Sequence, residues 1–217
     1  IHSTPCFPEF VSKGYPGCCE STRYGQHYFC ITFEQSEINR IAEQQQINWP
    51  QIYDKNLPSA LRSDVPSFGA WLDDQHITAP TNRSIELTSS GGKNFIHFAK
   101  NKEWNSNLYE DFVAPQLDSD LITETWQNGV GQMPSFCSAN YSYEVMNSNS
   151  IMLPNGPSWT ETRDHSKWAV ARTGSYVCLG DINRQYSQAR RGGGTMCFCD
   201  SEVHSTFNNL VQNFDRC

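Results

Sequence analysis

The residues most suited to chemistry stand near the C-terminal end of the chain, in Asp164-His165-Ser166-Lys167. Residues two apart on a strand point to the same face, so this spacing would place the His165 imidazole beside the Lys167 ammonium. A titratable nitrogen next to a fixed positive charge is the pairing that attack on a phosphodiester needs. The pair can also arise by coincidence in 217 residues with six histidines, so its surroundings must support it.

A second candidate group is the run Arg190-Arg191-Gly192-Gly193-Gly194. The guanidinium of Arg191 and the glycine amides could together wrap an anion. The alternative is a tight turn before Cys197 in which only glycine tolerates the backbone, and the sequence favours this structural interpretation.

Ring-bearing residues elsewhere have simpler interpretations. His97 lies in an apolar segment and is expected to be a core histidine. Trp104, Trp126 and Trp168 could stack on nucleobases, but core packing is the expectation for each.

Hydrophobic periodicity and turn signals predict the elements that position these residues. Strands are expected over residues 27–33, 84–89, 93–100, 120–126, 167–171 and 175–182. Residues 120–126 alternate apolar and polar side chains, as a half-buried strand does. Helices are expected after a cap at Ser36, over 108–114 up to Pro115, and over 202–214. The interleaving predicts an α/β layer fold in one domain, 1–217, with residues 1–26 as an irregular connection.

The nine cysteines favour an oxidising compartment, and their odd number leaves at least one free or paired outside the chain. Sequons at Asn82 and Asn140 support glycosylation and a secretory route, so we expect a lysosomal or secreted protein. No apolar run is long enough to span a membrane. Because the chain begins with Ile1, it is interpreted as a processed or excised product.

The formal charge of −7 argues mildly against a nucleic-acid ligand, which prefers basic surfaces. Protonation of the six histidines in an acidic compartment would bring the charge close to zero. Cys18-Cys19 and Cys197-Phe198-Cys199 lack the second cysteine or histidine pair of a zinc site. We therefore expect neither a metal nor another cofactor.

Short blocks along the whole chain supply the context that a lone His-x-Lys lacks. In this order, they resemble the deoxyribonuclease II family: His2-Ser3, Tyr24-Gly25-Gln26 before Cys30, 84–89, Phe98-Ala99-Lys100, 164–168, 180–184, and 191–195 before Cys197.

The resemblance implies a phospholipase D-like fold, a mixed β-sheet flanked by helices. Two pseudo-symmetric halves of this fold each contribute one His-x-Lys to a shared site. No other histidine here has a lysine two residues later, so the chain would be the C-terminal portion, with its His-x-Lys half over 164–217. Its partners would be DNA and the N-terminal chain of the same precursor, and it would carry half of the active site.

By the same resemblance, the activity is a metal-independent acid endonuclease reaction on DNA. One paired histidine forms a phosphohistidine and the other protonates the 5′ oxygen, which leaves 3′-phosphate and 5′-hydroxyl ends. The absence of clustered carboxylates at metal-ligand spacing fits this route. We expect activity at low pH, because one histidine must be protonated while its partner is not, with pKa values near that of free imidazole.

Individual roles follow from matching positions. His165 would be one of the paired histidines, and Lys167 would grip the phosphate. Asn183 matches a family asparagine that could orient the imidazole or donate to phosphate. Asp181 could stabilise an imidazolium or cap a turn, and His2 could belong to the site or be structural. Arg172 occupies roughly the place of the usual acidic partner, which leaves the residue orienting His165 unidentified.

The family pattern also implies disulfide bonds. It pairs Cys178 with Cys197 and Cys137 with Cys217, and it links Cys30 to a cysteine in the N-terminal portion. Cys6, Cys18, Cys19 and Cys199 stay unassigned.

Two other functions remain open. One is a catalytically inactive secreted relative that binds nucleic acid or a host partner, because its other half has lost its His-x-Lys. The other is an extracellular nuclease, such as a venom or digestive enzyme, that uses the same chemistry outside the lysosome.

Overall fold

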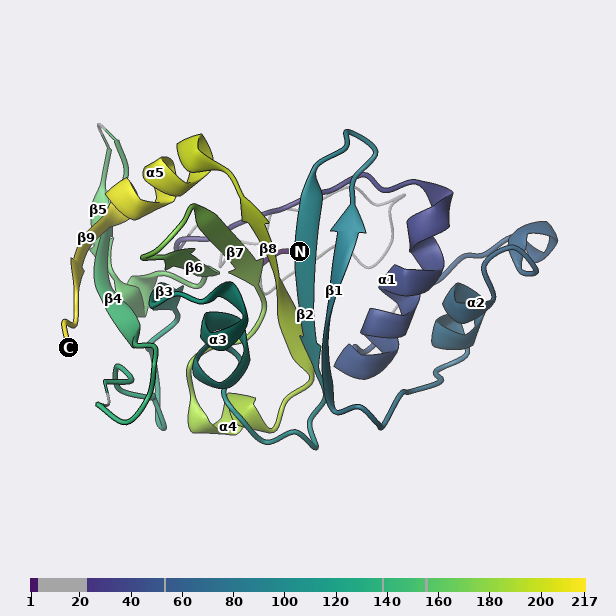
Figure 1. The fold of residues 1–217 in the computed structure, drawn as a ribbon, viewed down its shortest axis with the longest axis horizontal. Helices are drawn as coiled ribbons and strands as arrows, with labels where there is room; N and C mark the ends of the chain where they lie inside the picture. Colours follow the sequence, from purple (N-terminus) through teal and green to yellow (C-terminus); the bar gives the residue numbers. More distant parts are fainter. Residues whose placement is uncertain (4–22, 53, 138, 155) are drawn as a thin grey trace.

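The structure is a computed structural model that describes residues 1–3, 23–52, 54–137, 139–154 and 156–217. These residues build one mixed sheet of nine strands with helices packed around it (Figure 1). The expectation of a mixed α/β fold is thereby confirmed. The two-half, phospholipase D-like arrangement stays a prediction.

The sheet runs in the order β1-β2-β8-β7-β6-β3-β4-β5, with β9 pairing β4. Within the described chain, β3 and β4 are parallel and the other named pairs are antiparallel. The strands are β1 Asn82–Thr88, β2 Asn94–Lys100, β3 Leu121–Thr125, β4 Val145–Met152, β5 Ser158–Thr160, β6 Lys167–Ala171, β7 Tyr176–Gly180, β8 Gly193–Cys199 and β9 Val211–Phe214. The order places the start of β6, the end of β7 and the start of β8 at one end of neighbouring strands.

Some helices pack on the faces of the sheet, and others lie beside its β1 edge. They are α1 Gln35–Asn48, α2 Pro66–Leu72, α3 Ala114–Leu117, α4 Tyr186–Ala189 and α5 Ser201–Leu210, with 3-10 turns Ser59–Leu61 and Glu161–Arg163 and a π-helical turn Tyr109–Val113. α1 packs beside β1 and β2, and α2 lies outside α1 (Figure 1).

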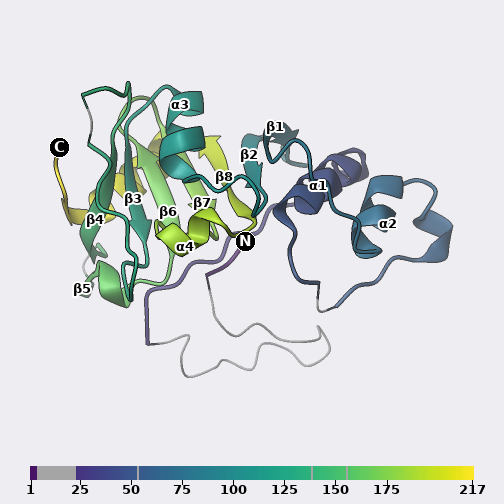
Figure 2. The same cartoon turned by 90° about the horizontal axis from the view of Figure 1, so that it is seen from below.

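Two apolar clusters form the core, one on each face of the sheet. Phe98, Leu121 and Ala169 belong to the cluster that packs under the turn 109–113 and α3. Phe95, Trp168 and Met196 belong to the other, which α5 and the segment 29–33 cover. Figure 2 shows α3 on one side of the sheet and the segment leading into α1 on the opposite side.

The expected hairpin around Gly91-Gly92 is confirmed as β1 and β2, and the two strands around Gly174 as β6 and β7. The expected strand 27–33 is wrong, because this segment makes only isolated bridges, among them His2 with Tyr28 and Phe33 with Ser89. Its apolar side chains instead pack against the second core cluster, on one face of the sheet.

Four local expectations need correction. Helix α1 begins before Ser36, with Glu34 at its N-cap. The chain does not leave the helix at Pro115, because Pro115 lies in the first turn of α3, where its missing N–H costs nothing. Strand β3 is buried at all five residues, since both sheet faces are covered. The expected helix 202–214 ends at Leu210, and β9 follows because it can pair with β4.

The structure contains the disulfides Cys137–Cys217 and Cys178–Cys197, the two pairs that the resemblance implies within the chain. Cys30 and Cys199 are free and exposed, while Cys6, Cys18 and Cys19 lie outside the described residues. Of the sequons, Asn82 starts β1 and is half-buried, and Asn140 is exposed. None of the described helices is long and apolar enough to cross a membrane.

Candidate active site

One cavity of about 700 Å³ gathers most of the predicted site residues. His165 precedes β6, Lys167 begins it, Asp181 follows β7, and Arg191 precedes β8. All four line this cavity, and His2 from the start of the chain lines it too. The His-x-Lys and the arginine-glycine run therefore belong to one site.

The His165 ring is oriented by a backbone carbonyl. Its Nδ1 is hydrogen-bonded to the carbonyl oxygen of Ser3. A carbonyl only accepts, so Nδ1 carries the proton, and in the neutral ring Nε2 keeps its lone pair. The residue orienting His165, which the sequence left unidentified, is therefore Ser3 acting through its main chain.

Ser3 is itself fixed by the segment 26–27. Its amide donates to the His27 carbonyl at 3.1 Å, and its hydroxyl donates to Gln26 Oε1 at 2.6 Å. The His27 amide donates back to the Ser3 hydroxyl at 2.9 Å. The block His2-Ser3 and the block Tyr24-Gly25-Gln26 thus cooperate to support His165.

An aromatic residue fixes the other side of the imidazole. Trp126 packs against His165 in a T-shaped arrangement with ring centroids 4.5 Å apart, and Tyr24 packs on Trp126 at 5.9 Å. Trp126 is half-buried and so does not simply fill the core. Edge-to-face contact restricts rotation of the imidazole.

Burial lowers the pKa of His165, and the charge of Lys167 lowers it further, against smaller opposing effects of Ser3 and Asp164. The pKa of this histidine therefore lies below that of free imidazole. The physical reason is that a half-buried imidazolium beside an ammonium is costly.

Lys167 is 4% exposed, and its Nζ donates to the His165 carbonyl and lies 3.4 Å from His165 Nδ1. Burial lowers the pKa of Lys167 to about 8, against the opposing charge of Asp181. The ammonium therefore remains charged at neutral and acidic pH and can hold a phosphate oxygen.

The turn before β6 is built around Asp164. Its Oδ1 accepts the Ser166 amide at 2.8 Å, and its Oδ2 accepts Trp159 Nε1 at 3.0 Å. Gly25 packs so tightly here that an added Cβ would come within 2.7 Å of the carboxylate. The Gly25 carbonyl accepts the His165 amide at 2.8 Å, which fixes the backbone of the candidate nucleophile.

Asp181 organises the arginine-glycine run. Its Oδ1 accepts the Gly194 amide at 2.8 Å, and its Oδ2 lies 3.3 Å from Arg191 Nη2. Arg191 also donates to the Asp181 carbonyl at 3.0 Å. The run is thus a structural turn capped by Asp181, and it also presents a guanidinium to the cavity.

Asn183 lies outside this arrangement. It is 7% exposed, does not line the cavity, and has no hydrogen-bond partner for its Oδ1. Its neighbour Arg184 is fully buried and donates to Glu110 Oε2 at 2.8 Å, which anchors the segment after β7.

Two ionisable residues escaped the sequence analysis, the half-buried His27 and the buried Glu124. His27 Nδ1 accepts the Lys167 amide at 3.4 Å, and burial followed by the charge of Lys167 lowers its pKa to about 3. Glu124 on β3 is fully buried, and burial raises its pKa well above its usual range. Only the position of His27 next to the Tyr24-Gly25-Gln26 block could have drawn attention to it.

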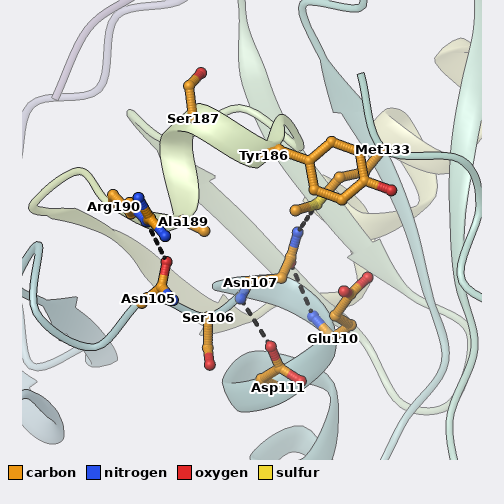
Figure 3. A pocket seen from close by; sticks show the side chains of 10 residues that line it. All are labelled: Asn105, Ser106, Asn107, Glu110, Asp111, Met133, Tyr186, Ser187, Ala189 and Arg190. Carbon is orange, nitrogen blue, oxygen red and sulfur yellow. Dashed lines mark hydrogen bonds between the residues drawn. The ribbon is translucent and has the colours of Figure 1, made fainter. Parts of the chain in front are cut away.

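A second cavity, of about 580 Å³, contains none of the predicted catalytic residues. Figure 3 shows its lining, where Arg190 Nε donates to Asn105 Oδ1 at 2.9 Å and the Asn107 amide donates to Asp111 Oδ2 at 2.7 Å. It has neither a histidine nor a lysine in its lining. The predicted catalytic residues therefore gather at the first cavity and not at the second.

Comparison with known proteins decides the family. A family model described as deoxyribonuclease II matches residues 1–217. The chain belongs to the deoxyribonuclease II family. Within this family it is 38% identical to Plancitoxin-1 of Acanthaster planci over 220 residues, which are all of this chain and 61% of that relative.

Two further family members carry enzyme names. The chain is 34% identical to Deoxyribonuclease-2-alpha of Mus musculus over 222 residues, covering 100% of this chain and 62% of the relative. It is 37% identical to Deoxyribonuclease-2 of Caenorhabditis elegans over 214 residues, covering 97% and 56%. The chain thus spans about three fifths of the length of these relatives.

Proposed function

We propose that the complete protein containing this chain is an acid endonuclease that hydrolyses DNA phosphodiesters without a metal. His165 and Lys167 would act together with a second His-x-Lys in the remainder of the protein, so this chain alone would carry half of the active site. Family membership and the names of the relatives support a nuclease. The observation that carries the proposal is the placement of His165, Lys167 and Arg191 around one cavity.

The geometry of His165 suits the nucleophile. With its proton held on Nδ1 by the Ser3 carbonyl, Nε2 can attack phosphorus directly. Lys167 and Arg191 would stabilise the charge on the non-bridging oxygens as the bond to the 5′ oxygen breaks. A histidine of the remaining portion would protonate that oxygen.

The second half of the reaction releases the enzyme. Water attacks the phosphorus of the phosphohistidine, the P–N bond breaks, and the nucleic acid keeps a 3′-phosphate opposite a 5′-hydroxyl. Burial and the charge of Lys167 lower the pKa of His165, which favours the neutral nucleophile, whereas the leaving-group histidine must be protonated. An acidic pH optimum follows from this difference.

The reaction belongs in an oxidising, acidic setting, which the two disulfides and the exposed Cys30 fit. We propose a lysosomal or secreted location, with glycans at Asn82 and Asn140. We also propose that Cys30 pairs with a cysteine of the remaining portion.

The test is cleavage of supercoiled plasmid by the complete protein at acidic pH in excess EDTA. We expect nicking that persists in EDTA, and 3′ ends that a polymerase extends only after phosphatase treatment. A strict requirement for magnesium, or ends that are extendable without phosphatase, would overturn the proposal.

A further inference from the structure

Two sets of residues of different chemistry line the active-site cavity. His165, Lys167 and Arg191 form a cationic end suited to phosphate. Gln45, Asn48 and His97, contributed by α1 and β2, line the same cavity and form what we call its neutral end. With a volume of about 700 Å³, the cavity falls within the usual size of small-molecule sites and has room beyond a single phosphate group.

Asn48 offers a buried acceptor at the neutral end. It is the last residue of α1 and is 7% exposed. Its Nδ2 donates to Gln45 Oε1 at 3.4 Å, while its Oδ1 has no hydrogen-bond partner. The amide therefore has a defined orientation with its oxygen unused.

The position of Asn48 is tightly fixed against the arginine-glycine run. An added Cβ on Gly192 would lie 2.0 Å from the Asn48 carbonyl oxygen, so the end of α1 packs directly on that loop. Trp49 ends the helix in the left-handed conformation, with φ of 52°. The neutral end is thus built against the segment that presents Arg191.

His97 adds a second unused polar group. It is 4% exposed, and its Nδ1 is buried without a hydrogen-bond partner. Burial, followed by the charge of Arg83, lowers its pKa to about 4. His97 is therefore uncharged under mildly acidic conditions and suits a neutral hydrogen-bonding ligand rather than a phosphate.

The Trp49 ring, which also lines the cavity, is already in contact with two neighbours. The Trp49 ring packs on His76 with centroids 5.1 Å apart, and Lys102 lies 5.0 Å from the centre of the same ring. Buried polar groups without partners cost free energy until a ligand satisfies them. The polar edge of a ligand at the neutral end would satisfy such groups.

We propose that the neutral end binds the edge of a nucleobase close to the scissile phosphate, with Asn48 Oδ1 accepting a hydrogen bond from an exocyclic amino group. Adenine, cytosine and guanine carry such a group and thymine does not. This inference rests on the proposed nuclease function. It adds a base preference at one position beside the cut.

The first experiment maps cleavage sites of the complete protein on duplex DNA of random sequence. We expect thymine to be depleted about fivefold at one position next to the cut, the effect of one lost hydrogen bond. Asn48→Leu should abolish this depletion, whereas Asn209→Leu, on the exposed part of α5, should retain it.

The second experiment changes the substrate by a single functional group. An oligonucleotide with adenine at that position is compared with one that carries purine, which lacks only the amino group. We expect the wild-type protein to cut the purine substrate about fivefold more slowly, and Asn48→Leu to cut both at the same rate.

The outcomes separate this inference from the proposed function. Cleavage without any base preference, or Asn48→Leu slowing all sequences equally with its preference intact, overturns the base site and leaves the nuclease standing. A complete protein that cuts no DNA overturns both.

Discussion

At the scale of single residues, the imidazole of His165 is controlled by two neighbours with opposite effects. The Ser3 carbonyl holds the proton on Nδ1, and the Lys167 ammonium at 3.4 Å disfavours a second proton. In the proposed mechanism, activation of His165 as the nucleophile combines a fixed tautomer with a lowered pKa. Neither requires a carboxylate at the position of Arg172.

Removing the charge of Lys167 should raise the pKa of His165. Burial would still lower the pKa of His165, but the charge of Lys167, which is the second largest cause of the lowering, would be gone. In Lys167→Gln, NMR titration of the imidazole should report His165 protonating at higher pH than in the wild type. Lys55→Gln, at an exposed position, is the control. An unchanged His165 titration in Lys167→Gln would contradict this electrostatic account.

At the scale of elements, the loop before β8 depends on glycine. Gly193 has φ of 154°, and an added Cβ would lie 2.6 Å from Asp181 Oδ1, the atom that accepts the Gly194 amide. Substitution must therefore break the contact that holds the loop. Gly92 also has positive φ, of 79°, but an added Cβ there meets nothing within 4 Å.

This contrast gives a matched pair of variants. We expect Gly193→Ala to lower the free energy of unfolding by roughly 2–3 kcal/mol and to reduce cleavage by about tenfold or more. Gly92→Ala should cost about 1 kcal/mol and leave cleavage intact. Denaturant unfolding and plasmid nicking measure the two effects, and equal losses in both variants would count against a role for the Asp181 contact.

Sequence reasoning succeeded where the determining interactions are local. The turn at Gly91-Gly92 predicts the β1–β2 hairpin, and the spacing of His165 and Lys167 puts both at one site. It failed where contacts with distant segments decide the secondary structure. Val211–Phe214 has spacing compatible with a helix, but pairing with β4 makes it a strand.

The rest of the site was hidden for the same reason. His27 approaches Lys167 across 140 positions of the sequence, and Asn48 meets Gly192 through the packing of α1. No spacing rule links such residues. Asn183 shows the converse: a matching motif predicts it in the site, but it is buried and does not line the cavity, so its role stays a prediction.

At the scale of the whole molecule, buried histidines make stability depend on pH. His97 in the folded protein has a pKa of about 4, whereas in the unfolded chain it titrates near 6.5. Between these values the unfolded state binds more protons, so stability falls as pH drops through this window. The slope from one such group is about 1.4 kcal/mol per pH unit.

Replacing His97 should flatten this dependence. We expect the free energy of unfolding of His97→Gln to fall less steeply between pH 6.5 and 4 than that of the wild type, by up to about 1.4 kcal/mol per pH unit. Urea unfolding at several pH values measures the slopes. Parallel curves for the two proteins would show that His97 does not resist protonation.

The central claim is that His165 performs the chemistry, and His165→Asn in the complete protein tests it most directly. Nicking of plasmid at acidic pH in excess EDTA should fall by roughly 10³-fold or more, with the melting temperature close to that of the wild type. His204→Asn, on α5 outside the cavity, is the control and should keep its activity. A folded His165→Asn protein that cuts DNA within tenfold of the wild-type rate would contradict the account.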